Sequence, residues 1–410
     1  MAHFDPASRE EEAREEIAAT RVPRALAAAL TAAFLALLAS GPALELGAAL
    51  GRRSEVLAAL PPAPGGALAR ARAAIAELES RFDARSALVR AVRAPAQALL
   101  LGAFGYGNER AYPGRDGWLF FREDFDHLTA GPPARAAERA AAAVIGFRDR
   151  LAERGIALVV LPAPDKLAIE PARFVRDAPP PPLRPAAEEA WLAALADAEV
   201  EVLDPAPRLA RDEISGRAVY LARDTHWSPE AVDAVARDLA LVLRAVVALP
   251  AGDPARWRED ALAVEGTGDT AALLGLSGSA PRSARQRVEI RPVTSGAAGG
   301  RPWRPARGAP VLLLGDSFSA VYSQPELGWG AGAGLAERLS FHLGLPVDRI
   351  TRNAGGASAT REALADDLAR DPARLAGVAV VVWQFAAREI TRGEWRPVSL
   401  SRSVPRGPAR

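Results

Sequence analysis

A serine that directly follows an apolar stretch is the first residue of this sequence that could do chemistry. Residues 311–314 read Val-Leu-Leu-Leu, and Gly-Asp-Ser-Phe-Ser follows at 315–319. In α/β proteins the carboxyl ends of the strands form the sheet edge where ligands bind. Glycine allows a tight turn there, and the N–H groups at the start of a helix can stabilise developing negative charge. Ser317 is therefore a candidate nucleophile. The plain alternative is that Asp316 or Ser317 simply caps a helix.

A histidine with a nearby carboxylate is the second candidate. Serine is a weak nucleophile until a base takes its proton, and histidine suits that task. His226 stands in Asp-Thr-His-Trp, and Asp224 can turn toward the imidazole and orient it. The Asp-x-His spacing also occurs in metal sites, but these need a further histidine or carboxylate. None stands nearby at a recognisable spacing. The sequence thus predicts Ser317, His226 and Asp224 as a triad, with a metal site or a structural histidine as alternatives.

The composition excludes several other classes of protein. Cysteine is absent, so the chain has no disulfides, thiolate metal ligands or cysteine nucleophile. Lys plus Arg number 51 and Asp plus Glu number 50, giving a formal charge of +1. Nucleic-acid binding needs many basic contacts to phosphates. We therefore expect no nucleic-acid partner.

Helices and strands alternate in the region that must position these residues. Short continuous apolar strands separated by helices are typical of a parallel sheet covered on both faces, the α/β class. Ser228 and Pro229 are a favourable N-cap and first helical residue. Residues 249–310 are rich in Gly and Pro, and we expect them to be irregular with at most short strands. The predicted strands cover residues 156–162, 200–203, 311–315, 348–351 and 378–383, and the predicted helices 134–154, 186–198, 229–247, 334–343 and 360–370.

An uncharged stretch near the N-terminus predicts a membrane anchor. Residues 25–44 carry no charge, and twenty residues at about 1.5 Å each span a hydrocarbon core of about 30 Å. A buried helix and a cleaved signal peptide are alternatives, although the polar leader is long for a signal peptide. Arg21 and Arg24 favour an inside N-terminus. The predicted regions are a cytoplasmic leader (1–24), a transmembrane anchor (25–44), a helical spacer or accessory region (45–107), the catalytic domain (108–395) and a tail (396–410).

The order of the two motifs carries a resemblance. SGNH/GDSL hydrolases place a GDS turn after their first strand and an Asp-x-x-His pair near the C-terminus, whereas here an Asp-x-His pair precedes the serine. This order is similar to the permuted SGNH hydrolase-like domain of the alginate O-acetyltransferase family of AlgX and AlgJ. The motifs that carry the resemblance are Glu79–Arg85, Gly114–Phe121, Leu161–Pro171, Tyr220–Val232, Thr267–Asp269, Val311–Ser319, Gly328–Glu337, Ala357–Glu362 and Trp383–Ile390.

The resemblance implies roles at matching positions. The three triad residues would be nucleophile, general base and orienting carboxylate. The oxyanion hole would combine the N–H of Ser317 with the Gly355–Gly356 pair and a third donor. Gln384 stands at the third position in place of a clear Gly-x-Asn-Asp, and Asn353 is an alternative.

Four further residues match family positions or adjoin the predicted cleft. Lys166 and Arg388 are expected to form structural ion pairs, because acyl transfer requires neither. Trp227 adjoins the triad and Trp329 lies in a glycine-rich loop. Tryptophan beside a polar cleft can stack on sugar rings, so both are candidates for binding a polysaccharide.

The resemblance implies an O-acetyltransferase that acts on an extracytoplasmic polysaccharide through an acetyl-serine. The chain would be anchored once in the inner membrane with its catalytic domain in the periplasm. A membrane-bound O-acyltransferase partner would supply the acetyl group, and no metal or cofactor is implied. A polysaccharide acetylesterase with the same triad is one alternative. A non-catalytic subunit of an export complex is another, although the intact triad counts against it.

Overall fold

The computed structural model of the protein describes residues 23, 25–36, 39, 87–129, 131, 135–275, 285–296, 300–353 and 355–398. The chain divides into two compact units, Met1–Ala96 and Gln97–Arg410. Most of the predicted leader, residues 37, 38 and 40–44 of the predicted anchor, most of the spacer and most of the tail lie outside the described residues. Residues 25–36 are helical and exposed. In the described residues, every helix is too short or too polar to cross a membrane.

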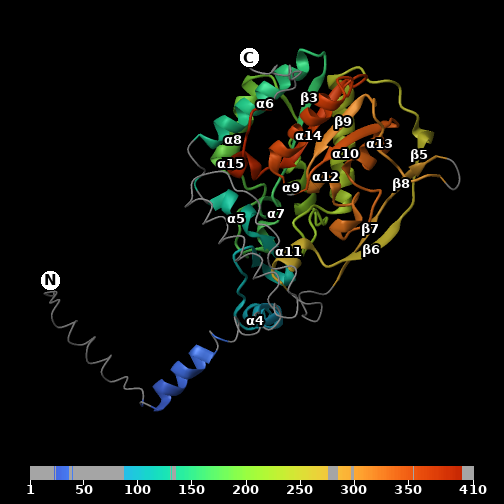
Figure 1. The fold of residues 1–410 in the computed structure, drawn as a ribbon. Helices are drawn as coiled ribbons and strands as arrows, with labels where there is room; N and C mark the ends of the chain where they lie inside the picture. The colour runs from blue at the N-terminus through green and yellow to red at the C-terminus, as the bar shows by residue number, and fades with distance from the viewer. Residues whose placement is uncertain are drawn as a thin grey trace, which may run out of the picture. The chain divides into compact units, whose positions relative to one another are not determined.

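A five-stranded parallel sheet forms the centre of the second unit (Figure 1). Its strand order is β10 (Val347–Thr351), β9 (Val311–Gly315), β11 (Val380–Ala386), β3 (Ala157–Ala163) and β4 (Glu201–Val202). The register pairs Gly315 with Thr351 and Ala386 with Ala163. Because the strands are parallel, the loops that follow them all leave from one edge of the sheet. The predicted α/β class and parallel sheet are confirmed.

Helices cover both faces of this sheet (Figure 1). Successive strand side chains point to opposite faces: Leu313 packs in the cluster on one side, and Leu312 and Leu314 in the cluster on the other. The first face is covered by α10 (Pro229–Val246) and α13 (Leu335–Leu343), and the second by α6 (Ala136–Ala152), α8 (Ala186–Asp197) and α14 (Gly356–Arg370).

Local sequence signals account for α10. The Ser228 hydroxyl accepts a hydrogen bond from the N–H of Ala231 at 3.2 Å, and Pro229 is the first helical residue. The predicted N-cap is therefore confirmed. By contrast, α14 begins at Gly356, four residues before the start that we predicted.

The Gly/Pro-rich region 249–310 has more order than its composition indicates. It contains two short antiparallel ladders, which pair β5 (Trp257–Glu259) with β8 (Val293–Ser295) and β6 (Leu262–Gly266) with β7 (Gln286–Ile290). The other elements of the described chain are α4 (Ala87–Phe104), β1 (Ala111–Pro113), β2 (Leu119–Phe121), α5 (Arg122–Thr129), α7 (Lys166–Ile169), α9 (Ala206–Ile214), α11 (Asp269–Leu273), α12 (Ser317–Ala320), α15 (Glu389–Arg392) and the short 3₁₀ turns.

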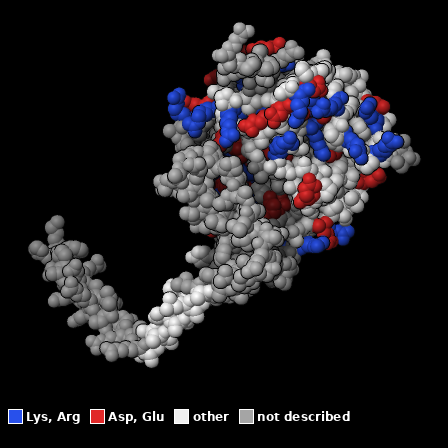
Figure 2. All heavy atoms as spheres, in the orientation of Figure 1, with Lys and Arg blue, Asp and Glu red and all other residues white. Residues whose placement is uncertain are grey.

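The described surface carries both signs of charge. On the face in Figure 2, basic and acidic side chains are interspersed over the second unit. This distribution agrees with the near-equal counts of the two kinds of residue.

Candidate active site

The candidate nucleophile lies at the carboxyl end of β9. Ser317 is the first residue of α12 and is partly exposed. Two residues earlier, Gly315 leaves room for the turn, because a Cβ added there would lie only 2.2 Å from the Oγ atom of Ser319. Any other residue at position 315 would displace the start of α12. Glycine at position 315 therefore allows the turn to pack closely against the Ser319 side chain, next to the candidate nucleophile.

Asp316 locks this turn through both of its carboxylate oxygens. Its Oδ1 accepts the N–H of Phe318 and the Nε2 of Gln384, both at 2.8 Å, and its Oδ2 accepts the N–H of Ala386 at 2.8 Å. The Oε1 of Gln384 in turn accepts the N–H of Asp316 at 3.1 Å. Asp316 is thus the helix cap, as one of our alternatives had it. The cap leaves the neighbouring Ser317 partly exposed.

Asp224 and His226 lie on a tight loop in front of α10. An antiparallel bridge pairs Tyr220 with Trp227, and the N–H of Leu221 donates to the carbonyl of His226 at 3.1 Å. The Nδ1 of His226 is 2.6 Å from the Oδ1 of Asp224, and the backbone N–H of His226 donates to the same oxygen at 3.0 Å. The predicted Asp–His pair therefore forms.

The other carboxylate oxygen of Asp224 accepts hydrogen bonds from residues outside the loop. Its Oδ2 accepts the backbone N–H of Asp269 at 2.9 Å and the indole Nε1 of Trp329 at 2.8 Å. Burial alone would raise the pKa of Asp224, but the charge and hydrogen bonds of His226 and the bond from Trp329 hold it below its ordinary value. Burial alone would lower the pKa of His226, but Asp224 above all raises it. The pair thus favours an ionised carboxylate beside a basic imidazole.

Aromatic packing brings this loop to the serine turn. The ring centroids of His226 and Phe318 are 4.8 Å apart, and the indole Nε1 of Trp227 donates to the carbonyl of Phe318 at 2.8 Å. Phe318 is the neighbour of Ser317 in α12. Within the described residues, no hydrogen bond joins the Ser317 hydroxyl to the imidazole, and such bonds often form only in the substrate complex. The complete triad therefore stays a prediction.

The prediction that Trp227 and Trp329 stack on sugar rings is wrong. Both side chains are fully buried, so neither ring can meet a ligand. Each instead donates its indole N–H inside the protein, Trp227 to the turn of α12 and Trp329 to Asp224. Through these hydrogen bonds the two buried tryptophans stabilise the loop and the turn of the candidate site.

The residues predicted for the oxyanion hole make other contacts. Gln384 is buried and bonded to Asp316 as described, which gives it a role in holding the turn. Gly355 and Gly356 line a cavity of about 250 Å³ together with Glu389, whose Oε2 accepts the N–H of Ala357 at 3.2 Å. The alternative donor, Asn353, donates to the Oε1 of Gln324 at 2.6 Å. A role for any of them in binding an oxyanion stays a prediction.

Asp269 is a further residue of the candidate site, to which the sequence analysis gave no role. The expectation that no further carboxylate stands near Asp224 and His226 is wrong, because the fold brings Asp269 there from the start of α11. The possible ligand atoms of these three residues lie within 4.8 Å of one another. Both oxygens of Asp224 already accept hydrogen bonds, however, and the imidazole Nδ1 is one of the groups bonded to them. These contacts are those of an acid–base pair. The one available signal was the Thr-Gly-Asp motif at 267–269.

Lys166 is a buried cation that ties the candidate site to the β1–β2 hairpin. The expected ion pair is wrong, because its ammonium donates to backbone carbonyls between 2.7 and 3.1 Å away. Burial lowers the pKa of Lys166 to about 7. Because one of the acceptors is the carbonyl of Asp224, the lysine helps to fix the loop that carries the Asp–His pair. The four acceptors belong to Leu119, Leu221, Ala222 and Asp224.

Arg388 forms the structural ion pairs that we predicted. Its guanidinium lies 3.0 Å from the Oδ1 of Asp124 and 3.6 Å from the Oδ1 of Asp165. Burial, above all, raises the pKa of Asp124 to about 8 and that of Asp165 to about 7, against the opposing charge of Arg388. The guanidinium also lies 5.7 Å from the centroid of the Phe318 ring. This buried charge cluster thus supports the turn that carries the candidate nucleophile.

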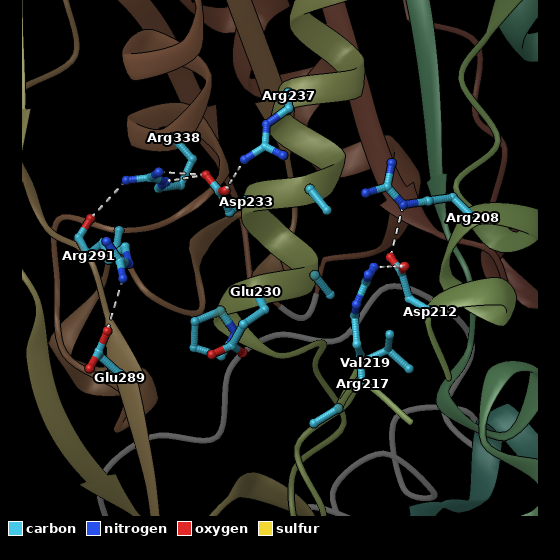
Figure 3. A pocket seen from close by; sticks show the side chains of 15 residues that line it. Arg208, Asp212, Arg217, Val219, Glu230, Asp233, Arg237, Glu289, Arg291 and Arg338 are labelled. Atoms are coloured by element: carbon cyan, nitrogen blue, oxygen red, sulfur yellow. Dashed lines mark hydrogen bonds and ion pairs between the residues drawn. The ribbon is translucent and has the colours of Figure 1, made fainter. Parts of the chain in front are cut away.

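A second, highly charged pocket lies between α9, α10 and α13. It measures about 300 Å³, and its arginines reach carboxylates within the pocket wall (Figure 3). Asp233 binds both Arg237 and Arg338, at 3.0 and 2.6 Å, and Asp212 binds both Arg208 and Arg217, at 2.9 and 2.5 Å. The triad candidates are not among its lining residues. The five arginines that line this pocket are therefore each paired with a carboxylate of its wall.

The parallel sheet, with an Asp–His pair packed against a strand-end serine turn, defines an SGNH hydrolase-like α/β protein. Residues 111–387 match the family described as "SGNH hydrolase-like domain, acetyltransferase AlgX", and the chain belongs to this family. The family resemblance seen in the sequence is thereby confirmed.

Curated relatives and a solved structure agree with this assignment. The chain is 28% identical over 299 residues to the probable alginate O-acetylase AlgJ of Pseudomonas aeruginosa, covering 70% of this chain and 71% of that protein. It is 26% identical over 300 residues to the probable alginate O-acetylase AlgJ of Azotobacter vinelandii, with coverage of 70% and 71%. The solved O-acetyltransferase domain of Pseudomonas putida AlgJ is similar with a TM-score of 0.52 and 25% identity, covering 69% of this chain and 92% of that one.

Proposed function

We propose that this protein is an O-acetyltransferase that acetylates hydroxyl groups of a polysaccharide through an acetyl-enzyme on Ser317. The observation that carries the proposal is the Asp224–His226 pair, joined at 2.6 Å and packed through Phe318 against the serine turn. Membership of an acetyltransferase family supports the choice of the transferred group.

The first half-reaction loads the serine. The Nε2 of His226 takes the Ser317 hydroxyl proton while the Oγ attacks the carbonyl carbon of an acetyl donor. Asp224 stabilises the imidazolium that forms. When the tetrahedral intermediate collapses, the bond to the donor's leaving group breaks, and that group takes the proton from His226. The product is an acetyl ester on Ser317.

The second half-reaction delivers the acetyl group to the acceptor. His226, now neutral, takes the proton of a sugar hydroxyl as the sugar oxygen attacks the acetyl carbon. The bond to the Ser317 Oγ breaks, and the serine recovers the proton from the imidazolium. Water in place of the sugar would give acetate, so the outcome depends on how well the occupied site excludes water.

The names of the relatives direct the choice of acceptor, and the proposed location of the site directs the choice of donor. Two relatives are named probable alginate O-acetylases, so alginate is the first acceptor that we propose. A membrane-bound O-acyltransferase is the donor partner that we propose, because a site outside the membrane has no access to cytosolic acetyl-CoA. No metal or cofactor takes part in either half-reaction.

Acetyl transfer from a chromogenic ester tests this function. With p-nitrophenyl acetate, the protein should release nitrophenol and carry a transient acetyl group on Ser317, seen by mass spectrometry of the peptide. Adding alginate oligosaccharides should move acetyl from water to the sugar. Ser317→Ala should abolish both the adduct at position 317 and the acetylated sugar, because the alanine side chain has no oxygen to carry the acetyl ester.

The matched control is Ser319→Ala in the same turn, whose hydroxyl donates to the carbonyl of Asp316 at 2.8 Å. This variant should keep the adduct on Ser317. Free acetate as the sole product at every acceptor concentration would replace the transferase with an acetylesterase. Full activity of Ser317→Ala would overturn the mechanism.

We further propose that residues 25–44 anchor the protein in the inner membrane, with the second unit in the periplasm. The support is the uncharged stretch itself, preceded by Arg21 and Arg24.

Topology mapping tests this location. A reporter that is active only in the periplasm should be active when fused after Arg410, because a single crossing leaves the C-terminus outside. Protease added to spheroplasts should digest the chain beyond about residue 46. A mature protein that begins near Ser40 or Leu44 would show a cleaved signal peptide and contradict the anchor.

A further inference from the structure

We propose that Asp269 is a second carboxylate partner of His226, which shares with Asp224 the positive charge that the imidazole gains during the reaction. This inference rests on the proposed function, since it assigns a further residue to the same site. It makes Asp269 a positioning residue that acts through the histidine and has no direct contact with the acetyl group.

The start of α11 packs against the loop that carries the Asp–His pair. Gly268 has a φ of +81°, and a Cβ added there would lie 2.2 Å from the carbonyl oxygen of Arg223. Only glycine allows both this backbone conformation and this approach. The N–H of Ala271 donates to the same carbonyl at 3.2 Å, and the N–H of Asp269 donates to Asp224 Oδ2 at 2.9 Å. The backbone at Asp269 is therefore fixed relative to the triad carboxylate.

The Asp269 side chain is oriented by one oxygen and presents the other to the histidine. Its Oδ1 accepts the N–H of Thr225 at 2.7 Å and the Thr225 hydroxyl at 3.0 Å. Its Oδ2 lies 3.6 Å from the Nδ1 of His226. The hydroxyl of Thr270 donates to the same Oδ1 at 3.1 Å. Because Oδ1 accepts three hydrogen bonds, the position of Oδ2 is set by the fold and not by the histidine.

The two carboxylates have different environments and so suit different tasks. The Asp224 side chain is 1% exposed and that of Asp269 is 40% exposed. Asp224 holds the imidazole Nδ1 by a short hydrogen bond, which orients the ring. Asp269 is farther away and acts by charge. The partial burial of the Asp269 carboxyl and the charge of Asp224 raise the pKa of Asp269, while Asp269 itself contributes to the raised pKa of His226.

Charged groups other than Asp224 and Asp269 also lie near His226 and contribute to the electrostatic potential at its ring. Asp316, at the start of α12, also raises the pKa of His226. The positive charge of Lys166 interacts with the carboxylates of Asp224 and Asp269. Arg388 lies near the Phe318 ring, and its charge interacts with that of Asp316. A variant that removes one negative charge must therefore be compared with a variant that removes a similar charge farther away.

Asp269→Asn removes the charge and keeps an oxygen that can accept both bonds from Thr225. The experiment is an NMR titration of the His226 ring in the full chain carrying Ser317→Ala, with the resonance assigned by its loss in a His226→Gln chain. The pKa of His226 should be lower in Asp269→Asn than in its parent, because the imidazolium loses a neighbouring anion. In the chain with Ser317 intact, the acidic limb of the kcat/KM profile should move to lower pH, since neutral imidazole is the active form.

Two variants serve as matched controls. Glu265→Gln removes an exposed carboxylate from β6 and should leave the titration of His226 unchanged. Asp269→Glu keeps the charge and should return the pKa of His226 toward the parent value. An unchanged titration in Asp269→Asn, or an equal shift in Glu265→Gln, would overturn the proposal.

The outcome can be separated from that of the proposed function. The titration requires no acetyl chemistry, so it is valid even if no acetyl-serine forms, and an unshifted titration leaves acetyl transfer to alginate untouched. If Asp269→Asn does not fold, the parent chain supplies the measurement, because interacting groups each report both titration steps. The ¹³C resonance of the Asp269 carboxyl should then show a second step at the pKa of His226. Its absence would contradict the proposal.

Discussion

Replacing His226 with alanine should lower kcat for acetyl transfer by about 10⁴- to 10⁶-fold, the range found when the base of a serine triad is removed. The physical reason is that an unassisted serine hydroxyl is a weak nucleophile at neutral pH. The measurement is the steady-state rate of nitrophenol release, with accumulation of acetyl-Ser317 followed by mass spectrometry. Asp224→Asn should keep the fold and lower kcat by about 10⁴-fold, because the wrong imidazole tautomer is favoured.

His342→Ala is the matched control. His342 also pairs with a carboxylate, at 2.6 Å from the Oδ1 of Asp233, but it lies on α13 and has no place in the proposed site. Its kcat should stay within about threefold of that of the parent chain, as expected for a change outside the active site. If His226→Ala kept more than a tenth of the parent rate, another group would have to serve as the base.

Replacing Arg388 with methionine should lower the free energy of unfolding by about 3–5 kcal/mol at pH 9, the cost of leaving buried partner charges uncompensated. In the parent chain both Asp124 and Asp165 are ionised at that pH, because beside Arg388 their pKa values are about 8 and about 7. As the pH falls below 7 both carboxyls take up protons, and the cost of losing the guanidinium should shrink. Urea unfolding followed by tryptophan fluorescence at pH 9 and pH 5.5 measures the difference.

Arg392→Met controls for the loss of an exposed arginine. Arg392 is 43% exposed and lies 3.9 Å from Asp126, and an exposed ion pair contributes only about 0–1 kcal/mol. Its effect should be small and nearly independent of pH. An equal loss of stability at both pH values for Arg388→Met would show that packing, and not charge, explains its role.

Local patterns in the sequence were sufficient for the elements and for the two chemical motifs. The apolar run at 311–314 and the cap at Ser228 predict β9 and α10 because strand burial and helix capping depend on residues adjacent in the chain. The Asp224–His226 pair could be predicted for the same reason, since the two residues lie on one loop. The order of the motifs was enough to identify the family. The ladders within 249–310 could not be predicted, because short strands form there only through pairing across the fold.

The tertiary structure alone decided what surrounds those motifs. Trp329 is 105 positions from Asp224 and Asp269 is 45 positions away, and their bonds to its carboxylate depend on how distant loops pack. The burial of Trp227 likewise follows from the docking of its loop on α12. Tryptophan is equally suited to a core and to a sugar site, so its residue type cannot distinguish the two. Composition and spacing describe neighbours along the chain, whereas the environment of the candidate triad is made by neighbours in space.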